Sequence, residues 1–287
     1  MGAINPFTDF GFKKIFGEEA SKEILIDFLN AILQRPDNII EIEFQDKEKH
    51  GDKYRDRKVI YDIYCTDSKG SKFIVEMQNA KQLYFKDRTI FYSTFPIREQ
   101  AQRGDWDFKL QPVYCIGLLG FDMEKNDDRY FYEAKLKDQY NEVFYDKLTF
   151  IYLELPKFKL REKDLKTNVE KWLYFLKHLE DFNELPNILN QPVFRKAFER
   201  AKEANLTSEE RDAYEESLKS YRDNINVIDT ARKEGREEGR EEGREEGREE
   251  GREEEKRQIA RGLKQAGVSV EIIQSTTGLS KQEIVEI

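Results

Sequence analysis

Two short strand-like segments separated by a turn constrain the fold of this chain more than any other feature. Residues 59–65 (VIYDIYC) and 73–78 (FIVEMQ) are rich in β-branched and aromatic residues, which favour strands. Residues 66–71 (TDSKGS) between them have the composition of a turn. The sequence therefore predicts a β-hairpin folded about Lys69.

This hairpin sets two acidic residues opposite one another. Asp62 and Glu76 each lie seven residues from Lys69, and directly paired residues share one face of a sheet with Cβ atoms about 4.5–5.5 Å apart. Alternation puts Gln78 on that face and turns Val75 and Met77 to the other. An ordinary hairpin can carry two acids on its solvent face. However, like charges in opposition are destabilising unless a positive charge lies between them, which favours a divalent cation.

The type of metal follows from the ligands. Carboxylate oxygens suit Mg²⁺, Mn²⁺ or Ca²⁺, whereas zinc prefers imidazole or thiolate. The two histidines, His50 and His178, are far from one another and from any cysteine, which argues against a zinc site or a Ser-His-Asp triad. Cys65 and Cys115 fall in expected strands and are predicted to be reduced core residues.

The segments around the hairpin indicate an α/β fold. Hydrophobic periodicity predicts helices and strands in the order α, β, β, β, α, β, which is typical of a mixed sheet with helices on its faces. The second of these helices is expected to bend or break near Pro96. The elements outside the hairpin are a helix over 21–34, a strand over 39–44, a helix over 83–103 and a strand over 111–119.

Four sequence segments carry a resemblance to a known family. The chain is similar to the bacterial PD-(D/E)XK nuclease family transposases, also called recombination-promoting (Rpn) nucleases, over about residues 5–121. An opening motif is formed by Asp9, Phe12 and Lys13, and Asp62, Glu76 and Gln78 follow on the hairpin. The segments are NPFTDFGFKKIFG (5–17), the amphipathic run 24–33, VEMQ (75–78) and QAQRG (100–104).

The resemblance implies a restriction-endonuclease-like mixed sheet core and metal-dependent hydrolysis of phosphodiester bonds in DNA. The word transposase reflects association with recombination or mobile elements rather than strand transfer. Asp62 and Glu76 are then the metal ligands and Gln78 positions the attacking water, a task given to a lysine in the wider superfamily. Asp9 is the expected third acid, with Glu19 and Glu23 as alternatives.

Lys13 and Arg88 are the candidate substrate-binding residues. Arg88 and Tyr92 share one helix face at i, i+4 spacing, so they either meet a phosphate, support the acidic pair or pack on one another at the surface. Basic residues before the hairpin suit either phosphate contact or a solvated loop, because acids are interleaved with them. They are Lys47, Lys49, Lys53, Arg55, Arg57 and Lys58.

Charge and hydropathy set wider bounds. The net charge is −9, of which residues 235–254, with five Arg and ten Glu, contribute −5 and the rest of the chain −4. This balance neither supports nor excludes DNA as the partner. The longest apolar run, residues 113–121, is far short of the roughly 20 residues needed to span a membrane. With no visible signal peptide, the chain is expected to be cytoplasmic and not membrane-bound.

The remainder of the chain divides into an extension, a repeat and a tail. The predicted domains are 1–125 for the nuclease-like core, 126–230 for a strand-then-helix extension, 231–256 for the repeat and 257–287 for the tail. Gly-Arg-Glu-Glu occurs five times in register. Each glycine costs a helix about 1 kcal/mol, whereas each ion pair returns only about 0.2–0.5 kcal/mol. The repeat is therefore predicted to be a spacer, with a charged assembly helix as the alternative.

The tail, residues 257–287, has the pattern of three short helices resembling a helix-turn-helix. Ser280 and Glu283 form a capping box, and Gly278 suits the end of the preceding helix. Such a unit contacts DNA, or docks and forms homo-oligomers through the C-terminal helical region.

Two rival functions remain open from the sequence. One is a catalytically inactive DNA-binding or assembly protein that retains the nuclease fold. The glutamine at position 78, where the superfamily has a lysine, leaves this alternative open. The other is an RNA-directed nuclease or toxin with the same fold.

Overall fold

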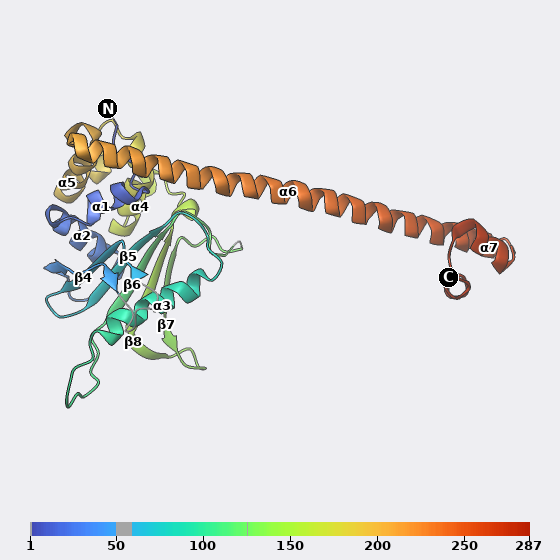
Figure 1. Ribbon diagram of the computed structural model, residues 1–287, viewed down its shortest axis with the longest axis horizontal. Coiled ribbons are helices and arrows are strands. Elements are labelled where there is room, and N and C mark those ends of the chain that lie inside the picture. Colours follow the sequence, from blue (N-terminus) through green and yellow to red (C-terminus); the bar gives the residue numbers. More distant parts are fainter. Residues whose placement is uncertain (1, 50–58, 125) are drawn as a thin grey trace. The chain divides into compact units, whose positions relative to one another are not determined.

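The computed structural model describes residues 2–49, 59–124 and 126–287 (Figure 1). The chain forms two compact units, Met1–Ile225 and Asn226–Ile287, which are described separately. Four of the basic residues before the hairpin that were considered for phosphate contact, Lys53, Arg55, Arg57 and Lys58, lie outside the described part of the chain. His50 does so too.

The first unit is built on a six-stranded mixed sheet. Its strand order is β1-β4-β5-β6-β8-β7. The first three strands are antiparallel, β5, β6 and β8 are parallel, and β7 returns antiparallel to β8. A two-stranded ribbon, β2 with β3, lies outside this sheet. The strands are β1 (Ile42–Phe44), β2 (Glu48–Lys49), β3 (Val59–Ile60), β4 (Ile63–Asp67), β5 (Lys72–Gln78), β6 (Val113–Leu119), β7 (Phe131–Lys137) and β8 (Val143–Glu154).

Helices cover both faces of this sheet. The helices α1, α2, α4 and α5 gather on one side and α3 crosses the other (Figure 1). The helices of this unit are α1 (Asp9–Phe16), α2 (Lys22–Leu33), α3 (Phe85–Arg98), α4 (Asn168–His178) and α5 (Pro192–Ala201), and α6 (Ser208–Gln265) begins within it. Short 3-10 turns connect them at Glu19–Ser21, Leu155–Lys157, Glu162–Asp164, Leu179–Asp181, Asn187–Leu189 and Glu203–Asn205.

The larger core joins the N-terminal helices to the helices that follow the sheet. Trp172 of α4 is fully buried, with its ring centroid 5.8 Å from Phe16, 5.7 Å from Phe28 and 4.5 Å from Phe194. Its indole N–H donates to Asp27 Oδ1 at 2.7 Å, so the polar edge of a buried ring has a partner. Segments from both ends of this unit therefore share one hydrophobic core.

The opposite face of the sheet packs against α3 through a smaller cluster around Tyr61, Ile74 and Phe95. Pro96 lies inside α3 and has no N–H to donate to the carbonyl of Tyr92 four residues earlier. The Tyr61 hydroxyl donates to that carbonyl instead, at 2.8 Å. A side chain from the hairpin therefore replaces the missing helical hydrogen bond.

The order of elements predicted for residues 21–119 is confirmed, with a mixed sheet and flanking helices. Three element bounds were wrong. The strand expected over 59–65 is interrupted at Asp62, because the Asp62 N–H donates to the Glu76 side chain rather than to a neighbouring strand. The strand expected over 39–44 is only Ile42–Phe44, the part that pairs with β4. The helix expected over 83–103 ends at Arg98, soon after the proline.

The second unit contains the rest of α6 with α7 (Val270–Thr277) and α8 (Lys281–Glu286). Its small core is formed by Ala260, Ile273, Leu279 and Ile284. The capping box at Ser280 and the left-handed C-cap at Gly278 (φ +75°) are both present, as predicted.

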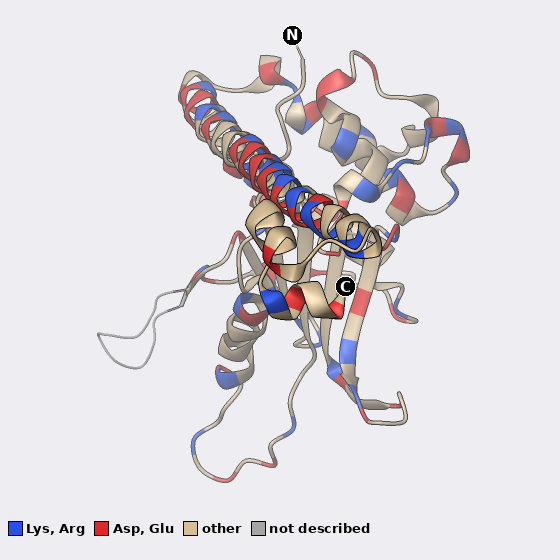
Figure 2. Ribbon diagram, turned by 90° about the vertical axis from the view of Figure 1, so that its right-hand side faces the viewer, with Lys and Arg blue, Asp and Glu red and all other residues tan. Residues whose placement is uncertain are grey.

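The repeat, residues 235–254, is helical and lies within α6. Its side chains are exposed, and acidic and basic residues alternate along the helix (Figure 2). A Cβ added at any of its five glycines meets nothing within 4 Å, so no packing in this chain requires them to be glycine. In the described part of the chain, no helix is both long and apolar enough to cross a membrane.

Candidate active site

The observed hairpin register brings Asp62 and Glu76 together. Ile63 pairs with Val75, so the preceding residue falls opposite Glu76, as expected for a hairpin centred on Lys69. Asp62 lies in the bend just before β4, and two hydrogen bonds connect it to β5. The Met77 N–H donates to Asp62 Oδ2 at 2.8 Å, and the Asp62 N–H donates to Glu76 Oε1 at 3.2 Å. Each carboxylate is thus fixed by the backbone of the other strand.

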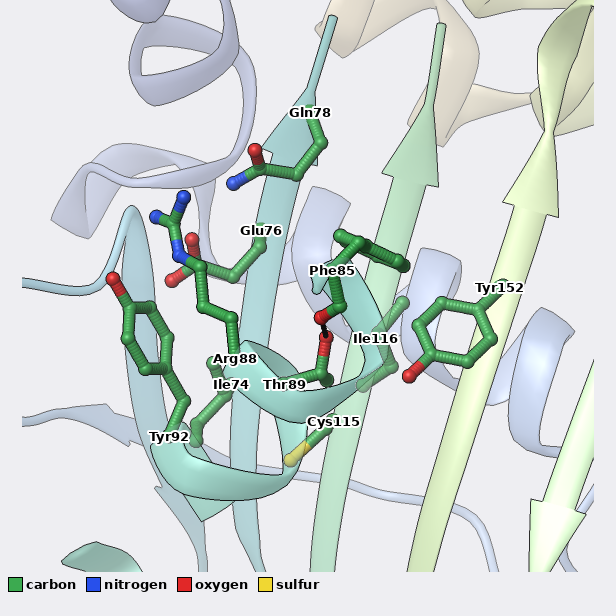
Figure 3. Close-up of a pocket in the computed structure, with 11 residues that line it drawn as sticks. Ile74, Glu76, Gln78, Phe85, Arg88, Thr89, Tyr92, Cys115, Ile116 and Tyr152 are labelled. Carbon is green, nitrogen blue, oxygen red and sulfur yellow. Dashed lines mark hydrogen bonds between the residues drawn. The ribbon is translucent and has the colours of Figure 1, made fainter. Parts of the chain in front are cut away.

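Alternation along β5 decides which side chains reach the site. Glu76 and Gln78 lie on the face covered by α3 and line a pocket with Ile74 (Figure 3). Val75 and Met77 pack into the core on the other face. The face predicted for each of these residues is therefore the one that it occupies.

Gly117 and Tyr152, on the next two strands of the sheet, lie level with Glu76 and line the same pocket. Glu76 is in register with Gly117 of β6, and Gly117 with Tyr152 of β8. A Cβ at Gly117 would approach Tyr152 Cδ1 to 3.0 Å, so a side chain here would displace the ring that forms the pocket wall. Neither residue was predicted from the sequence. The available signal for Gly117 was that glycines interrupt the apolar run 113–121.

Burial and mutual repulsion act on both carboxyl groups. The pKa of Glu76 is raised to about 8, first by burial and then by the negative charge of Asp62. Burial also raises the pKa of Asp62, against the lowering effect of the Met77 N–H bond. Such a pair is stabilised by a cation that binds between the two groups.

The donor set fits a hard divalent cation. Both groups are carboxylates, and the described residues give the second Asp62 oxygen no hydrogen bond. For Glu76, the Gln78 amide is a further contact that lowers the pKa. Oxygen donors of this kind are the ligands of Mg²⁺, Mn²⁺ and Ca²⁺. Asp62 and Glu76 are thus the residues that would hold such an ion.

Arg88 packs on Tyr92 and also lies beside the acidic pair. Its guanidinium lies 4.8 Å from the centroid of the Tyr92 ring and donates to Gln82 Oε1 at 2.6 Å. It also lines the pocket, and Figure 3 shows it turned toward Glu76, whose pKa its charge lowers. Packing on the tyrosine holds the positive charge beside the acidic pair.

Asp9 and Lys13 lie on α1 close to the site. They form an ion pair of 2.7 Å, with the Asp9 side chain 64% exposed. Asp9 raises the pKa of Asp62 and Lys13 lowers it, so both are electrostatic neighbours of the acidic pair. Nevertheless, the described residues contain no group of three or more acidic, histidine or cysteine side chains placed to hold a metal. A third acid from Asp9 stays a prediction.

The other two acids considered for that position have partners elsewhere. Glu19 pairs with Lys22 at 2.7 Å and Glu23 with Lys196 at 2.6 Å.

Lys47 is a neighbour of the site that the sequence suggested only as part of a basic segment. The Tyr61 N–H donates to its carbonyl at 3.0 Å, which places Lys47 beside the bend that carries Asp62. Burial and the charge of Lys13 lower its pKa, and its charge lowers that of Asp62. The position of Lys47 depends on the pairing of β2 with β3, and this pairing was not predicted from the sequence.

The sheet, its covering helices and the acidic pair define a protein of the PD-(D/E)XK nuclease type. The family model described as "PD-(D/E)XK nuclease family transposase" matches residues 6–231, and the chain belongs to this family. The match extends past the hairpin through α4 and α5 into α6. No curated protein and no solved structure significantly matches the chain.

Proposed function

We propose that this protein is a metal-dependent DNA endonuclease that hydrolyses phosphodiester bonds. The observation that carries the proposal is the buried pair Asp62 and Glu76, held by reciprocal backbone hydrogen bonds in a chain of a nuclease family. These two residues would hold Mg²⁺ or a similar ion. Such an ion supplies Lewis-acid stabilisation of charge on a phosphoryl oxygen and lowers the pKa of water.

Three further residues have roles in this proposal. Gln78 shares the face of Glu76 and positions the attacking water through its amide, which donates and accepts hydrogen bonds. Arg88 and Lys13 flank the acidic pair with positive charge and meet the scissile phosphate. The family description supports a role in recombination or mobile elements, which we include in the proposal.

Cleavage of supercoiled plasmid with Mg²⁺, Mn²⁺ or EDTA tests this function. We expect the wild type to nick or linearise the plasmid only with metal, and Asp62→Asn and Glu76→Gln to abolish cleavage. Glu23→Gln is the matched control, because it removes a carboxylate from a surface ion pair with Lys196. Activity that persists in both site variants would place the chemistry elsewhere.

The catalytically inactive alternative has two observations in its favour. Gln78 occupies the position that holds a lysine in the wider superfamily. In addition, the described residues include no third acid in a metal-binding group. Folded wild type that binds DNA without cutting it, under each metal, would favour this alternative. Stronger cleavage of RNA than of DNA of the same sequence would instead favour an RNA-directed nuclease.

A further inference from the structure

A second hollow adjoins the pocket that Glu76 and Gln78 line. It has a volume of about 540 Å³ and lies between the segment that follows β5 and the segment that follows β6. Phe85 lines both hollows, with its ring centroid 5.5 Å from Phe121 on one side and 5.5 Å from Tyr152 on the other. One side chain thus forms the wall between the two sites.

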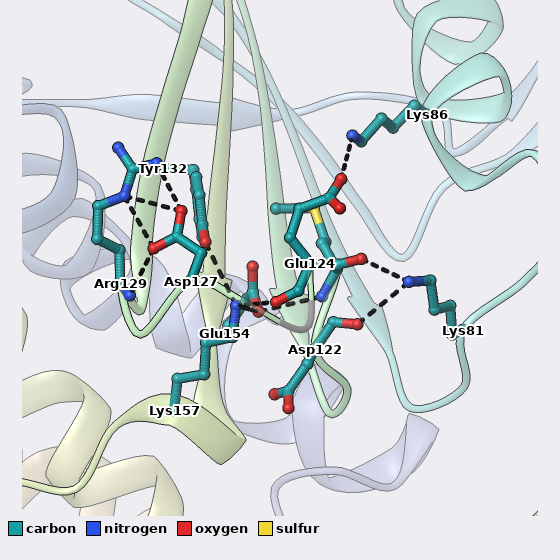
Figure 4. A network of polar contacts seen from close by, with 10 residues as sticks. Lys81, Lys86, Asp122, Glu124, Asp127, Arg129, Tyr132, Glu154 and Lys157 are labelled. Atoms are coloured by element: carbon teal, nitrogen blue, oxygen red, sulfur yellow. Dashed lines mark hydrogen bonds and ion pairs between the residues drawn. The ribbon is translucent and has the colours of Figure 1, made fainter.

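Hydrogen bonds hold the two segments that form this hollow. The Lys81 ammonium donates to the carbonyls of Asp122 and Met123, and Lys86 pairs with Glu124 at 2.8 Å (Figure 4). Behind them, Lys157 donates to the Glu124 carbonyl at 2.8 Å. These contacts connect the two segments that line the hollow.

Two large side chains at its mouth are left in solvent. Leu83 is 82% exposed and Tyr84 72% exposed. Tyr84 also has a left-handed backbone (φ +63°) at the start of α3, a conformation that is uncommon for a bulky residue and is concentrated at functional sites. Exposed apolar side chains at the rim of a hollow mark a binding site.

The charges at the rim indicate what kind of group binds. Lys81 and Lys86 are balanced by Asp87 and Glu124, so the hollow itself offers no net attraction for a phosphate. Its apolar lining from Tyr84, Phe121 and Met123 suits an uncharged planar ring, and aromatic side chains stack on nucleobases of any sequence.

We propose that this hollow binds a nucleobase that has left the base stack beside the scissile phosphate. Continuity with the acidic site supports it: Gln82 lines the hollow and accepts a hydrogen bond from Arg88, which lines the acidic pocket. The base enters the hollow while its backbone passes Arg88. The inference rests on the proposed function and adds a substrate class, namely DNA with unpaired nucleotides such as flaps, bulges and mismatches.

Binding of DNA that contains 2-aminopurine tests this inference without cleavage. The fluorescent base is placed in an unpaired bulge or in a perfect duplex, and each is titrated with protein in EDTA. We expect wild type to prefer the bulge and to change its fluorescence by stacking. Tyr84→Asn should weaken bulge binding by about fivefold or more, since stacking contributes about 1–3 kcal/mol per base.

The substitution is chosen for the backbone of Tyr84, and the control for its exposure. Asparagine tolerates the left-handed conformation, so Tyr84→Asn removes the ring without adding strain. Tyr140→Asn is the matched control, because Tyr140 is 77% exposed in the turn between β7 and β8 and should leave binding unchanged. Thermal unfolding of all three proteins verifies their folding.

The outcomes separate this inference from the proposed nuclease activity. Metal-dependent cleavage with no preference for unpaired DNA, unchanged in Tyr84→Asn, would refute the base site and leave the nuclease. Bulge-dependent fluorescence without cleavage under any metal would support the base site and refute the nuclease. Equal binding of bulge and duplex by wild type and variant would also overturn the base site, and would leave the exposed rim to a protein partner.

Discussion

At the scale of single residues, the acidic pair is stabilised by the backbone and destabilised by its own charge. Met77 and Asp62 donate their N–H groups to the two carboxylates, while burial raises the pKa of both. Two opposing effects therefore act on the same groups. The native state tolerates the pair, and a cation or a proton relieves the repulsion between them.

The first prediction concerns stability against pH in EDTA. Because the pKa of Glu76 is raised from 4.5 to about 8, the folded state holds this proton more tightly than the unfolded state does. Stability contributed by the protonated group is lost as pH rises through that interval. We expect Glu76→Gln to be more stable than wild type above the folded pKa, by up to about 5 kcal/mol because each pKa unit corresponds to about 1.4 kcal/mol, and within about 1 kcal/mol of it at about pH 5.

Urea unfolding across this pH range measures the difference. Glu23→Gln is the control, because Glu23 is exposed and paired with Lys196. A difference between Glu76→Gln and wild type that does not change with pH would contradict the prediction.

The second prediction concerns metal binding without turnover. A ligand that binds only the folded state at about 100 times its dissociation constant adds about 2.7 kcal/mol of stability. We expect MnCl₂ to raise the melting temperature of wild type and to leave that of Asp62→Asn unchanged. The same titration of Asp9→Asn tests the third acid: a reduced rise would place Asp9 among the ligands, and a full rise would exclude it.

At the scale of elements, the hairpin and α3 are joined where the helix lacks a hydrogen bond. The proline in α3 leaves the Tyr92 carbonyl without its helical donor, and the Tyr61 hydroxyl takes that place. The same helix carries Arg88 into the acidic pocket. Tyr61 lies between β3 and β4, and its hydroxyl therefore supports the helix that carries Arg88.

The third prediction is a double-mutant test of that hydrogen bond. Tyr61→Phe should destabilise the protein by about 1–3 kcal/mol, because it leaves the Tyr92 carbonyl unsatisfied. In a Pro96→Ala background the alanine N–H supplies a helical donor, so the same substitution should cost less. Urea unfolding of the four proteins gives the coupling. Equal costs in the two backgrounds would show that the hydroxyl does not compensate for the proline.

How far the sequence predicts the fold depends on the range of the interactions. The hairpin register and the faces of Glu76 and Gln78 follow from counting and alternation, which are local rules. The break at Asp62 follows from a side chain on another strand. Likewise, Lys47 reaches the site through the β2–β3 ribbon, whose strands have only two residues each. Pairings of this kind leave no periodic signal to find.

At the scale of the whole molecule, the two units differ in how they are stabilised. The first unit contains a large aromatic core, whereas the second has a cluster of four buried residues and a helix whose five repeat glycines pack against nothing described. The family match, residues 6–231, covers mainly the first unit. The roles predicted for the repeat as a spacer and for the tail in assembly stay predictions.

The fourth prediction is that the two units unfold in separate transitions. Both tryptophans, Trp106 and Trp172, lie in the first unit, so their fluorescence reports it alone, while far-ultraviolet circular dichroism reports both. Replacing Gly239, Gly243 and Gly247 with alanine should stabilise the helix by about 1 kcal/mol per site. We expect a shift in the circular dichroism transition that the fluorescence transition does not share. A common shift would show a single cooperative unit.

The wall formed by Phe85 predicts where the proposed nuclease would cut. Phe85 lies between the hollow proposed for an unstacked base and the pocket that Glu76 and Gln78 line, and α3 carries it together with Arg88. The spacing between the two sites is thus set by one helix turn and not by the substrate. On bulged substrates, cleavage should therefore occur at a constant number of nucleotides from the unpaired base. The position of the cut would then depend on where the bulge lies and not on the base sequence.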